Sequence, residues 1–537
     1  MRFQPILFAI FLLGLPLHAQ PTAILSDTFA DGERLTQSLP SSLAWYTGNT
    51  ARLNLSVRNG ALTLVANGTQ RDVWGYFPTV TLGVGDSLTF TIDFRWTSTP
   101  PNISTPGLKI ALCYSNGLAP RSADGVIPTG GYQGYGSFTN PADATSGTNI
   151  RKRDGPAALN STGTLLELTD GDIPVIWNSL RNGLNGTQLG NTTYTAVLKV
   201  TRTGADTASI ATSITGGTLS PNNTLIGTDS SNIFLNFDTI AIGAANSTQY
   251  GDLQVTRAEV VQEVNSARVV NLSILTSIPT PGESFALGYV VGGAGTSGPK
   301  PLVIRAAGPS LGALGVAGTI DDPKLELFAG GAKIGENDNW GGLADVREAM
   351  AAVGAFAFTG PNSRDAAVVA NVTGGGNNSV QVSAVGSGTG AVIAEIYDAT
   401  PTSTFSASTP RLINVSVLKH LGQGLTVGFV VNGSGTKTVL VRAIGPTLGA
   451  APFGVPGVVA DPQLALFLGT TPISVNDNWG GTAALNAAFA QVGAFVLPAN
   501  SRDAAIVATL APGSYSVQVG GVGGTTGVAL VEVYELQ

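Results

Sequence analysis

The chain has 537 residues, a formal net charge of −7, only 11% charged residues and 70 glycines. An average soluble protein is about 25% charged, and the acidic balance here excludes the basic surface that nucleic-acid binding requires. At ~100–200 residues per domain the length predicts three or four domains. Short β-rich runs between glycines and prolines favour an all-β protein.

The first 19 residues have the pattern of a secretory signal peptide. Arg2 supplies a positive flank, an apolar run covers Ile6–Leu17, and Leu17-His18-Ala19 places a small residue before a cleavage site. The apolar run is shorter than the ~20 residues that span a bilayer. We expect cleavage after Ala19, with Ala23 as the alternative site, and a secreted, extracellular or surface-attached protein that does not span a membrane.

Residues 24–263 contain no internal repeat and show the period-two alternation of β-strands, for example over Ser87–Phe94. Turns rich in glycine and asparagine separate these runs, which predicts a large two-sheet sandwich. The segments Asp27–Tyr46, Trp74–Phe77 and Phe237–Gly243 give the region a pattern that resembles a concanavalin A-like (LamG-type) jelly roll.

Aromatic side chains make sugar binding a candidate function of this domain. Trp74, Tyr76, Tyr132 and Tyr135 offer flat faces on which sugar rings can stack, while Asn, Asp and Arg side chains can bind hydroxyls. The alternative interpretation is that these rings belong to an ordinary sandwich core. The one cysteine, Cys113, lies in an apolar run and is expected to be a buried thiol.

Catalysis finds little support in the sequence. A glycosidase needs two carboxylates at a defined separation, and the cluster Glu167, Asp170 and Asp172 does not follow strand alternation from Glu167. Polysaccharide lyases of the concanavalin-like fold commonly use histidine, which residues 24–263 lack. The sequence also offers no Ser-His-Asp set and no His/Cys metal site. We therefore expect a protein without enzymatic activity.

The second half of the chain is duplicated. Three motifs return after 137, 139 and 138 residues: Arg305–Pro309 as Arg442–Pro446, Asn337–Gly342 as Asn476–Gly481, and Asn362–Ala367 as Asn500–Ala505. The offsets vary so little that the match is an ordered duplication. We place the repeats at 264–398 and 410–537, with a Ser/Thr-rich linker at 399–409.

Each repeat is predicted to be a small β-sandwich interrupted by one helix. Val346, Met350, Val353 and Phe356 have helical spacing and recur 139 residues later as an apolar face. The strand and turn order, best seen in the run Ala511–Val519, resembles the bacterial pre-peptidase C-terminal domain; the first copy lacks the tyrosine found in that run. The resemblance implies accessory modules of secreted bacterial proteins, which fold, space and attach rather than catalyse.

The repeated Asn-Asp-Asn-Trp-Gly-Gly turn is a candidate calcium site. Asp338 and Asp477 would be the anionic ligands of Ca²⁺, a cation that takes six to eight oxygen ligands, and the flanking asparagines would add carbonyl oxygens. The alternative is a purely structural turn, because Asn and Asp side chains bond to nearby backbone while Trp340 and Trp479 pack in the core.

Two arginines shared by the repeats predict buried ion pairs. Arg305 and Arg442 end apolar strands, so each guanidinium is expected to be partly buried and to need an anion. The carboxylates that both copies share are Asp365 and Glu395, repeated as Asp503 and Glu532. We interpret the arginines as members of structural ion pairs, with Glu395 and Glu532 as the assigned partners.

These patterns predict an exported all-β protein that binds an extracellular ligand without catalysis. Polysaccharide is the favoured ligand, held by residues 24–263, while the repeats act as scaffold. An alternative is a structural or adhesion protein of the cell surface, and a third hypothesis is a divergent polysaccharide-degrading enzyme. The sequence leaves the oligomeric state open.

Overall fold

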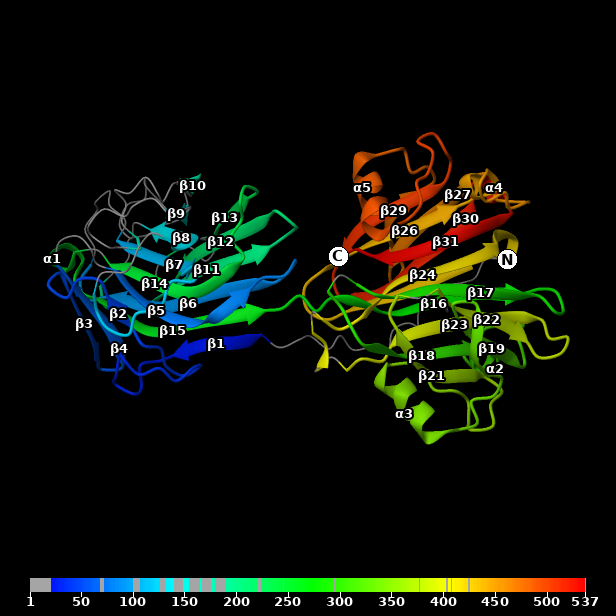
Figure 1. Cartoon of the computed structure of the whole chain (residues 1–537), viewed down its shortest axis with the longest axis horizontal. Helices are drawn as coiled ribbons and strands as arrows, with labels where there is room; N and C mark the ends of the chain where they lie inside the picture. Colours follow the sequence, from blue (N-terminus) through cyan, green and yellow to red (C-terminus); the bar gives the residue numbers. More distant parts are fainter. Residues whose placement is uncertain are drawn as a thin grey trace. The chain divides into compact units, whose positions relative to one another are not determined.

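The computed structural model describes residues 21–67, 72–99, 107–125, 131–139, 148–153, 165–166, 175–178, 190–217, 219, 224–244, 246–293, 295–375, 377–401, 404–406, 408–423 and 425–536. The signal segment 1–19 and the acidic cluster at 167, 170 and 172 lie outside these residues. Two compact units are present, residues 20–265 and residues 266–537, and each is described by itself (Figure 1). Within the described residues, no helix is both long and apolar enough to cross a membrane.

The first unit is a β-sandwich with one helical turn. Its elements are β1 (Thr22–Asp27), β2 (Tyr46–Thr47), β3 (Leu53–Arg58), β4 (Ala61–Ala66), β5 (Asp72–Thr81), β6 (Ser87–Trp96), β7 (Leu108–Tyr114), β8 (Gln133–Thr139), β9 (Thr148–Arg153), β10 (Val175–Asn178), β11 (Tyr194–Arg202), β12 (Ala208–Thr215), β13 (Thr224–Asp229), β14 (Asn236–Ala244), α1 (Ser247–Tyr250) and β15 (Leu253–Glu263).

The strands of the first unit form two sheets. The β6 sheet has the order β13-β12-β11-β6-β15-β4-β3, with β1 also paired to β15, and the β14 sheet has the order β10-β9-β8-β7-β14-β5-β2. Neighbouring strands are antiparallel, as in the β6–β15 and β14–β7 pairs. Alternation along β6 explains the layering, because Leu88, Phe90 and Ile92 are buried in the core while the threonines between them are half-buried.

The β14 sheet buries side chains on both of its faces. Along β14, Ile240 and Ile242 belong to the main core between the sheets, whereas Ala241 belongs to a second cluster. On β5 the same alternation separates Val73, in the main core, from Trp74, in the second cluster. The outer face of the β14 sheet therefore carries a covered apolar layer of its own.

The second unit contains both repeats. The first repeat supplies β16 (Arg268–Ile278), β17 (Ser284–Gly292), β18 (Pro299–Ala307), α2 (Pro309–Ala313), β19 (Pro323–Ala329), β20 (Ala332–Asn337), α3 (Ala344–Ala352), β21 (Ala366–Thr373), β22 (Asn378–Ala384) and β23 (Gly390–Asp398). The second repeat supplies β24 (Arg411–His420), η3 (Leu421–Gln423), β25 (Leu425–Asn432), β26 (Lys437–Ile444), α4 (Pro446–Gly449), β27 (Pro462–Leu468), β28 (Thr471–Asn476), α5 (Ala483–Val492), β29 (Ala504–Leu510), β30 (Gly513–Gly521), η4 (Val522–Gly524) and β31 (Val528–Glu535).

The two repeats share both of their sheets. The β16–β25 sheet has the order β21-β18-β23-β16-β25-β30-β27-β28, and the β17–β24 sheet has the order β20-β19-β22-β17-β24-β31-β26-β29. Each sheet takes four strands from each repeat, and replacing every strand by its counterpart in the other repeat converts one order into the other. The duplication is therefore folded as an approximate two-fold arrangement.

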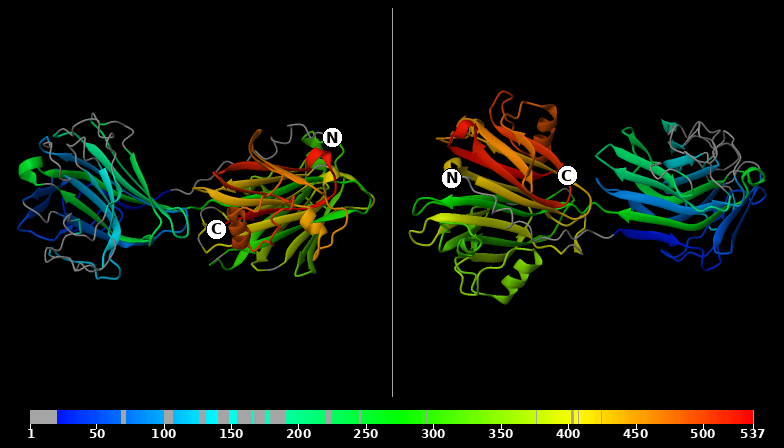
Figure 2. Two further views of the ribbon diagram at one scale, coloured as in Figure 1. Left: turned by 90° about the horizontal axis from the view of Figure 1, so that it is seen from above. Right: turned by 180° about the vertical axis from the view of Figure 1, so that it is seen from behind.

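The predicted all-β fold class is confirmed, and α3 and α5 are the predicted helices of the two repeats. They lie at opposite ends of the shared sandwich (Figure 1, Figure 2). Two features were not predicted. Each repeat has a further single helical turn, α2 or α4, that begins with a proline. Each repeat was also predicted to be a small sandwich of its own, whereas the two repeats join edge to edge, because β16 pairs with β25 and β17 pairs with β24.

This joining predicts that one repeat cannot fold alone. A fragment of residues 266–401 would expose the edges of β16 and β17 along their full length, and such edges favour aggregation. We expect this fragment to be aggregated or unfolded by circular dichroism and light scattering, while a fragment of residues 266–537 is a folded monomer. A soluble, cooperatively unfolding monomer of the single repeat would contradict the shared-sheet arrangement.

Candidate functional site

The second apolar cluster of the first unit lies on the outer face of the β14 sheet, and we name it the outer cluster. Its members are Ala44, Tyr46, Trp74, Tyr76, Ala111, Cys113, Tyr132, Phe138, Leu165, Leu166 and Ala241. Three of the four aromatic residues proposed from the sequence to bind sugar, Trp74, Tyr76 and Tyr132, come together here. The fourth, Tyr135, does not join them.

The rings of the outer cluster contact one another closely. The hydroxyls of Tyr76 and Tyr132 share a hydrogen bond of 2.9 Å, and the ring centroids of Tyr46 and Tyr76 are 6.4 Å apart. Burial, and then the hydrogen bond with Tyr76, raises the pKa of the Tyr132 phenol, which therefore stays protonated. The indole Nε1–H of Trp74 is buried and has no hydrogen-bond partner among the described residues.

These rings are covered rather than exposed, which corrects the expectation of open stacking faces. Trp74 and Tyr132 are 0% exposed, while Tyr46 and Tyr76 keep 9% and 8%. The cover includes Leu165 and Leu166, two buried side chains that lie between β9 and β10 in the sequence. The Tyr46–Tyr76 edge is therefore the most accessible part of the aromatic layer.

Charged side chains hold the Leu165–Leu166 cover in place. The backbone N–H of Leu166 donates to Asp72 Oδ2 at 2.7 Å, and Arg153 Nη1 donates to the carbonyl of Leu165 at 3.2 Å. Lys109 Nζ donates to the carbonyl of Leu166. Polar groups at the margin of the outer cluster therefore fix the position of this cover.

Tyr135 lies on the opposite side of its strand, in the main core. Its hydroxyl donates to Asp229 at 2.8 Å and accepts from the backbone N–H of Phe234 at 3.0 Å. Burial favours a higher pKa for Asp229, but the hydrogen bond from Lys152 at 2.8 Å lowers the pKa overall. Both sides of the Tyr135 hydroxyl are occupied, so this residue is removed from the candidate sugar contacts.

Cys113 is a buried member of the outer cluster. Its side chain is 1% exposed, and burial raises the pKa of the thiol to about 12. A thiolate is therefore rare at neutral pH, which fits a packing role for this residue.

Asp72 and Asp238, two carboxylates beside the outer cluster, are too far apart to act as a glycosidase pair. Asp72 is the cross-strand partner of Gly243, and Asp238 lies five residues before that glycine on β14. At ~3.3 Å per residue the separation is about 16 Å, against ~5–9.5 Å for catalytic pairs. Asp238 also accepts hydrogen bonds from the backbone and hydroxyl of Ser115, at 2.8 and 2.6 Å. Both carboxylates have structural roles.

The Asn-Asp-Asn-Trp-Gly-Gly turns use their asparagines to hold backbone. Asn337 Nδ2 donates to the carbonyl of Asn339 at 2.9 Å, and Asn337 Oδ1 accepts from the backbone N–H of Ala367 at 3.0 Å. Asn476 repeats both contacts in the second copy. Asp338 and Asp477 are exposed. Among the described residues, no group of three or more His, Cys, Asp and Glu side chains could hold a metal ion.

The structure places each shared arginine against the assigned glutamate. Arg305 and Glu395 are cross-strand partners on β18 and β23, and Arg305 Nε donates to Glu395 Oε2 at 3.0 Å. Arg442 and Glu532 repeat this on β26 and β31, with Nε at 2.9 Å and Nη2 at 2.5 Å from Glu532 Oε2. Both arginine side chains are 0% exposed.

Further contacts complete the surroundings of each guanidinium. Arg305 Nη1 donates to the carbonyl of Phe356 at 2.6 Å, and the guanidinium carbon lies 4.2 Å from the centroid of the Phe356 ring. The hydroxyl of Tyr397 donates to Glu395 Oε1 at 2.8 Å. Burial, and then the nearby Glu395 carboxylate, raises the pKa of Tyr397 and keeps this donor protonated. A buried charge with this many partners is a structural element rather than a free ligand site.

Asp365 and Asp503, the other shared carboxylates, cap the short helices. Asp365 Oδ1 accepts from the backbone N–H of Gly308 at 2.8 Å, and Asp365 also accepts from Ser310, at the start of α2. Asp503 accepts from Gly445 at 2.8 Å, at the start of α4. The repeated Gly-Pro and Asn-Ser-Arg-Asp motifs are therefore two halves of one structural contact.

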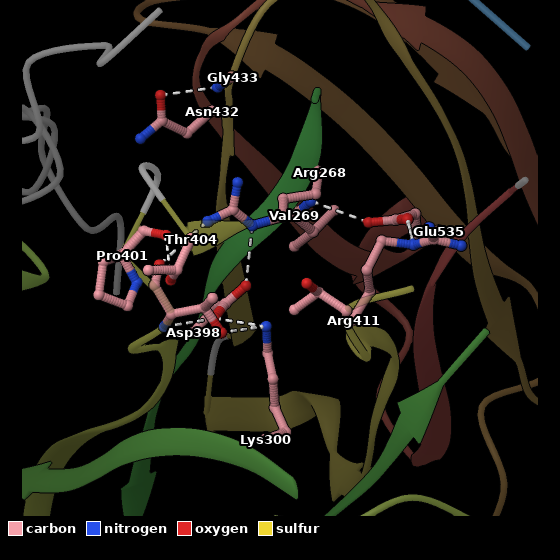
Figure 3. Close-up of polar contacts among 12 residues, drawn as sticks. Arg268, Val269, Lys300, Asp398, Pro401, Thr404, Arg411, Asn432, Gly433 and Glu535 are labelled. Atoms are coloured by element: carbon pink, nitrogen blue, oxygen red, sulfur yellow. Dashed lines mark hydrogen bonds and ion pairs between the residues drawn. The ribbon is translucent and has the colours of Figure 1, made fainter. Parts of the chain in front are cut away.

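Sequence reasoning missed a second pair of charge clusters, where the two repeats meet (Figure 3). We name them the junction triads, and their members are Arg268, Lys300 and Asp398 in the first and Arg411, Lys437 and Glu535 in the second. Figure 3 shows Arg268 and Lys300 converging on Asp398. Glu535 lies 2.7 Å from Arg411 and 2.9 Å from Lys437. Burial lowers the pKa of both lysines, and the neighbouring carboxylates oppose this shift.

A sequence signal for these triads existed. Lys300 and Lys437 are 137 residues apart, as are Asp398 and Glu535. Each lysine opens an apolar strand and each acid ends one, a position where a charge must find a partner if the strand end is buried. The equivalence of Asp398 and Glu535 is hard to recognise because the residue type differs between the two repeats. The triads also cross the repeat boundary, because the backbone N–H of Val269 donates to Glu535 Oε2 at 3.0 Å.

No protein-family model and no curated protein matches this sequence. Among solved structures, the Emp47p carbohydrate recognition domain is 14% identical, with 45% of this chain and 97% of that chain covered and a TM-score of 0.28. The VIP36 exoplasmic/lumenal domain in its metal-free form is 10% identical, with 45% of this chain and 92% of that chain covered and a TM-score of 0.28. The endo-1,3-beta-glucanase from Streptomyces sioyaensis is 12% identical, with 47% of this chain and 100% of that chain covered and a TM-score of 0.26. TM-scores of this size support no inference about what this chain does.

Removing one guanidinium tests the role of the buried ion pairs. Arg442→Met leaves Glu532 buried without its partner, and breaking such a pair costs about 3–5 kcal/mol of stability. We expect a large drop in melting temperature, and the double variant Arg442→Met/Glu532→Leu should recover much of it because no unpaired charge remains. Thermal melts of the full chain provide the measurement. Unchanged stability of the single variant would contradict a structural pair.

Proposed function

We propose that this chain is an exported, non-catalytic carbohydrate-binding protein. The ligand is an extracellular polysaccharide, held at the outer face of the β14 sheet, and the duplicated second unit is the scaffold. The observation that carries the proposal is the buried indole N–H of Trp74, which has no described partner inside an aromatic cluster. An unsatisfied buried donor costs free energy, and a ligand oxygen would remove that cost.

The surroundings of Trp74 suit a sugar ring. Tyr46 and Tyr76, at 9% and 8% exposure, form the edge of the cluster at which a sugar would make contact with the aromatic layer. At the same edge, Arg34 forms two hydrogen bonds with Asp124, at 3.1 and 2.7 Å, and both side chains are about one fifth exposed. Such half-exposed polar groups can exchange their mutual contact for sugar hydroxyls.

A structural or adhesion role is the second candidate, and the shared sheets favour it. Two repeats whose strands pair across the boundary give a scaffold with a continuous backbone hydrogen-bond network. Such a body resists separation of its halves, which suits a spacer between a surface and a ligand-binding unit. In this alternative the first unit contacts another protein and not a glycan.

Matched tryptophan substitutions test sugar binding. Trp74→Phe removes the unpartnered N–H, whereas Trp45→Phe alters an equally buried tryptophan of the main core whose Nε1 donates to Asp27 at 3.2 Å. We expect affinity electrophoresis of the full chain in gels containing soluble polysaccharides to reveal a retarding glycan. Trp74→Phe should weaken that retardation about tenfold, the equivalent of one hydrogen bond, and Trp45→Phe should not.

The same experiment separates the alternatives. If no polysaccharide in a broad panel retards the full chain, sugar binding is excluded and the adhesion role gains support. If a polysaccharide slows the migration of the full chain and also releases reducing sugar when it is incubated with the chain, the non-catalytic part of the proposal is wrong. Equal losses for the two tryptophan variants would show that general destabilisation, and not the indole N–H, lowers the affinity.

A further inference from the structure

The first junction triad holds a lysine and an aspartate in direct contact inside the protein. Lys300 Nζ lies 2.5 Å from Asp398 Oδ1, and both side chains are 0% exposed. Figure 3 shows the Lys300 amine pointing at the Asp398 carboxylate. Burial penalises both charges, so an uncharged form of this pair is more favourable here than it is at a protein surface.

Paired strands fix the backbone on either side of this contact. Asp398 is the cross-strand partner of Leu302 on β18, and Lys300 precedes Leu302 by two residues on the same strand. Strand alternation puts Lys300 and Leu302 on one face of the sheet, and Leu302 is 0% exposed in the main core of the second unit. β18 also pairs with β21 on its other side. The lysine and the aspartate are therefore held together at the end of an apolar core.

Two donors besides Lys300 contact the Asp398 carboxylate. Arg268 Nε donates to Oδ2 at 2.9 Å, and the backbone N–H of Thr400 donates to Oδ1 at 2.8 Å. The Arg268 side chain is only 2% exposed. Fixed donors that are shielded from solvent stabilise the negative charge that develops on a carboxyl oxygen when a nucleophile adds to its carbon. Arg268 is thus placed to favour addition at Asp398 Cγ.

The same surroundings favour a neutral amine on Lys300. Burial lowers the pKa of Lys300, the Asp398 carboxylate opposes this shift, and the positive charge of Arg268 adds to it. A lysine that is desolvated and lies next to another cation is a better nucleophile, because the neutral amine has a free electron pair. The hydroxyl of Thr400 accepts from Lys300 Nζ at 2.8 Å and fixes the direction of the amine.

We propose that Lys300 and Asp398 condense into an amide bond between their side chains, which links β18 covalently to β23. One ammonium proton passes from Nζ to Asp398 Oδ1, and the electron pair left on Nζ attacks Cγ. Arg268 stabilises the oxyanion that forms on Oδ2. A second proton passes from Nζ to Oδ1, the Cγ–Oδ1 bond breaks, and Oδ1 leaves as water. The third proton stays on the amide nitrogen, so the reaction needs no other reactant.

This bond gives the second unit a covalent cross-link of a kind that cysteine cannot supply. The chain contains one cysteine, so no disulfide can join two of its own strands. The amide closes the segment from Lys300 to Asp398 into a loop, and closing a long loop stabilises a fold by restricting the unfolded chain. A cross-linked unit suits the scaffold role, and the proposal is independent of sugar binding.

Peptide mapping of the full chain tests the proposal. Cleavage by trypsin at arginines places Lys300 and Asp398 in two peptides, residues 269–305 and 365–411, and Pro301 protects the bond after Lys300 from cleavage. We expect mass spectrometry to find the two peptides joined, with a mass one water below the sum of their masses. Recovery of both peptides only as separate species of full mass would overturn the proposal.

Two buried lysines of the second unit provide matched variants. Lys300→Met removes the nucleophile but keeps the pair of Arg268 with Asp398, and it should abolish the joined peptide. Lys419→Met changes a lysine that is 4% exposed and 3.0 Å from Glu283, and it should leave the joined peptide unchanged. A joined peptide that persists in Lys300→Met, or fragment ions that place the link on other side chains, would contradict the assigned bond.

Discussion

Antiparallel pairing between the two repeats is the interaction on which the second unit depends. β16 and β17 begin the first repeat, and each finds its outer partner in the second repeat, β25 and β24. Without this pairing four strand edges would present unpaired backbone groups to solvent. The core follows the same logic, because one continuous apolar cluster includes Leu287 and Ile304 from the first repeat with Phe429 and Val517 from the second.

Charges are buried at the ends of neighbouring strands within each repeat, although the chain has few charged residues. β16 pairs with β23 in the first repeat and β24 pairs with β31 in the second, so the start of one strand lies beside the end of the other. The junction triads compensate by placing two cations around each carboxylate. Deeper in each half, Arg305 and Arg442 are held by a glutamate on the adjacent strand. The ion pairs and hydrogen bonds of these buried charges offset the free-energy cost of removing them from water.

The sequence was most informative where one strand or one turn decides the outcome. Period-two patterning predicted the sandwich, helical spacing predicted α3 and α5, and a charge at the end of an apolar strand predicted a buried arginine. The strand register sets Glu395, the partner assigned from the sequence, directly beside Arg305. Asp365 instead caps α2, a helix too short for periodicity to reveal.

Features that depend on distant segments could not be read from the pattern. Alternation separates Tyr135 from the outer cluster, but it does not show that Leu165 and Leu166 pack against the outer rings. Pairing across the repeat boundary was equally hidden, because a duplicated sequence fits two separate sandwiches as well as one shared one. Three of the four rings expected to bind sugar do lie together, but they are buried in a covered layer instead of exposed.

Hydrogen exchange at the repeat boundary tests the shared scaffold most directly. Backbone amides of β16, β17, β24 and β25 that bond across the boundary should exchange as slowly as those inside either repeat, such as the β18–β23 pair, because all belong to one cooperative unit. Mass spectrometry of the full chain can follow these strands as separate peptides. Fast exchange confined to the boundary strands, with slow exchange inside each repeat, would contradict a single shared sandwich.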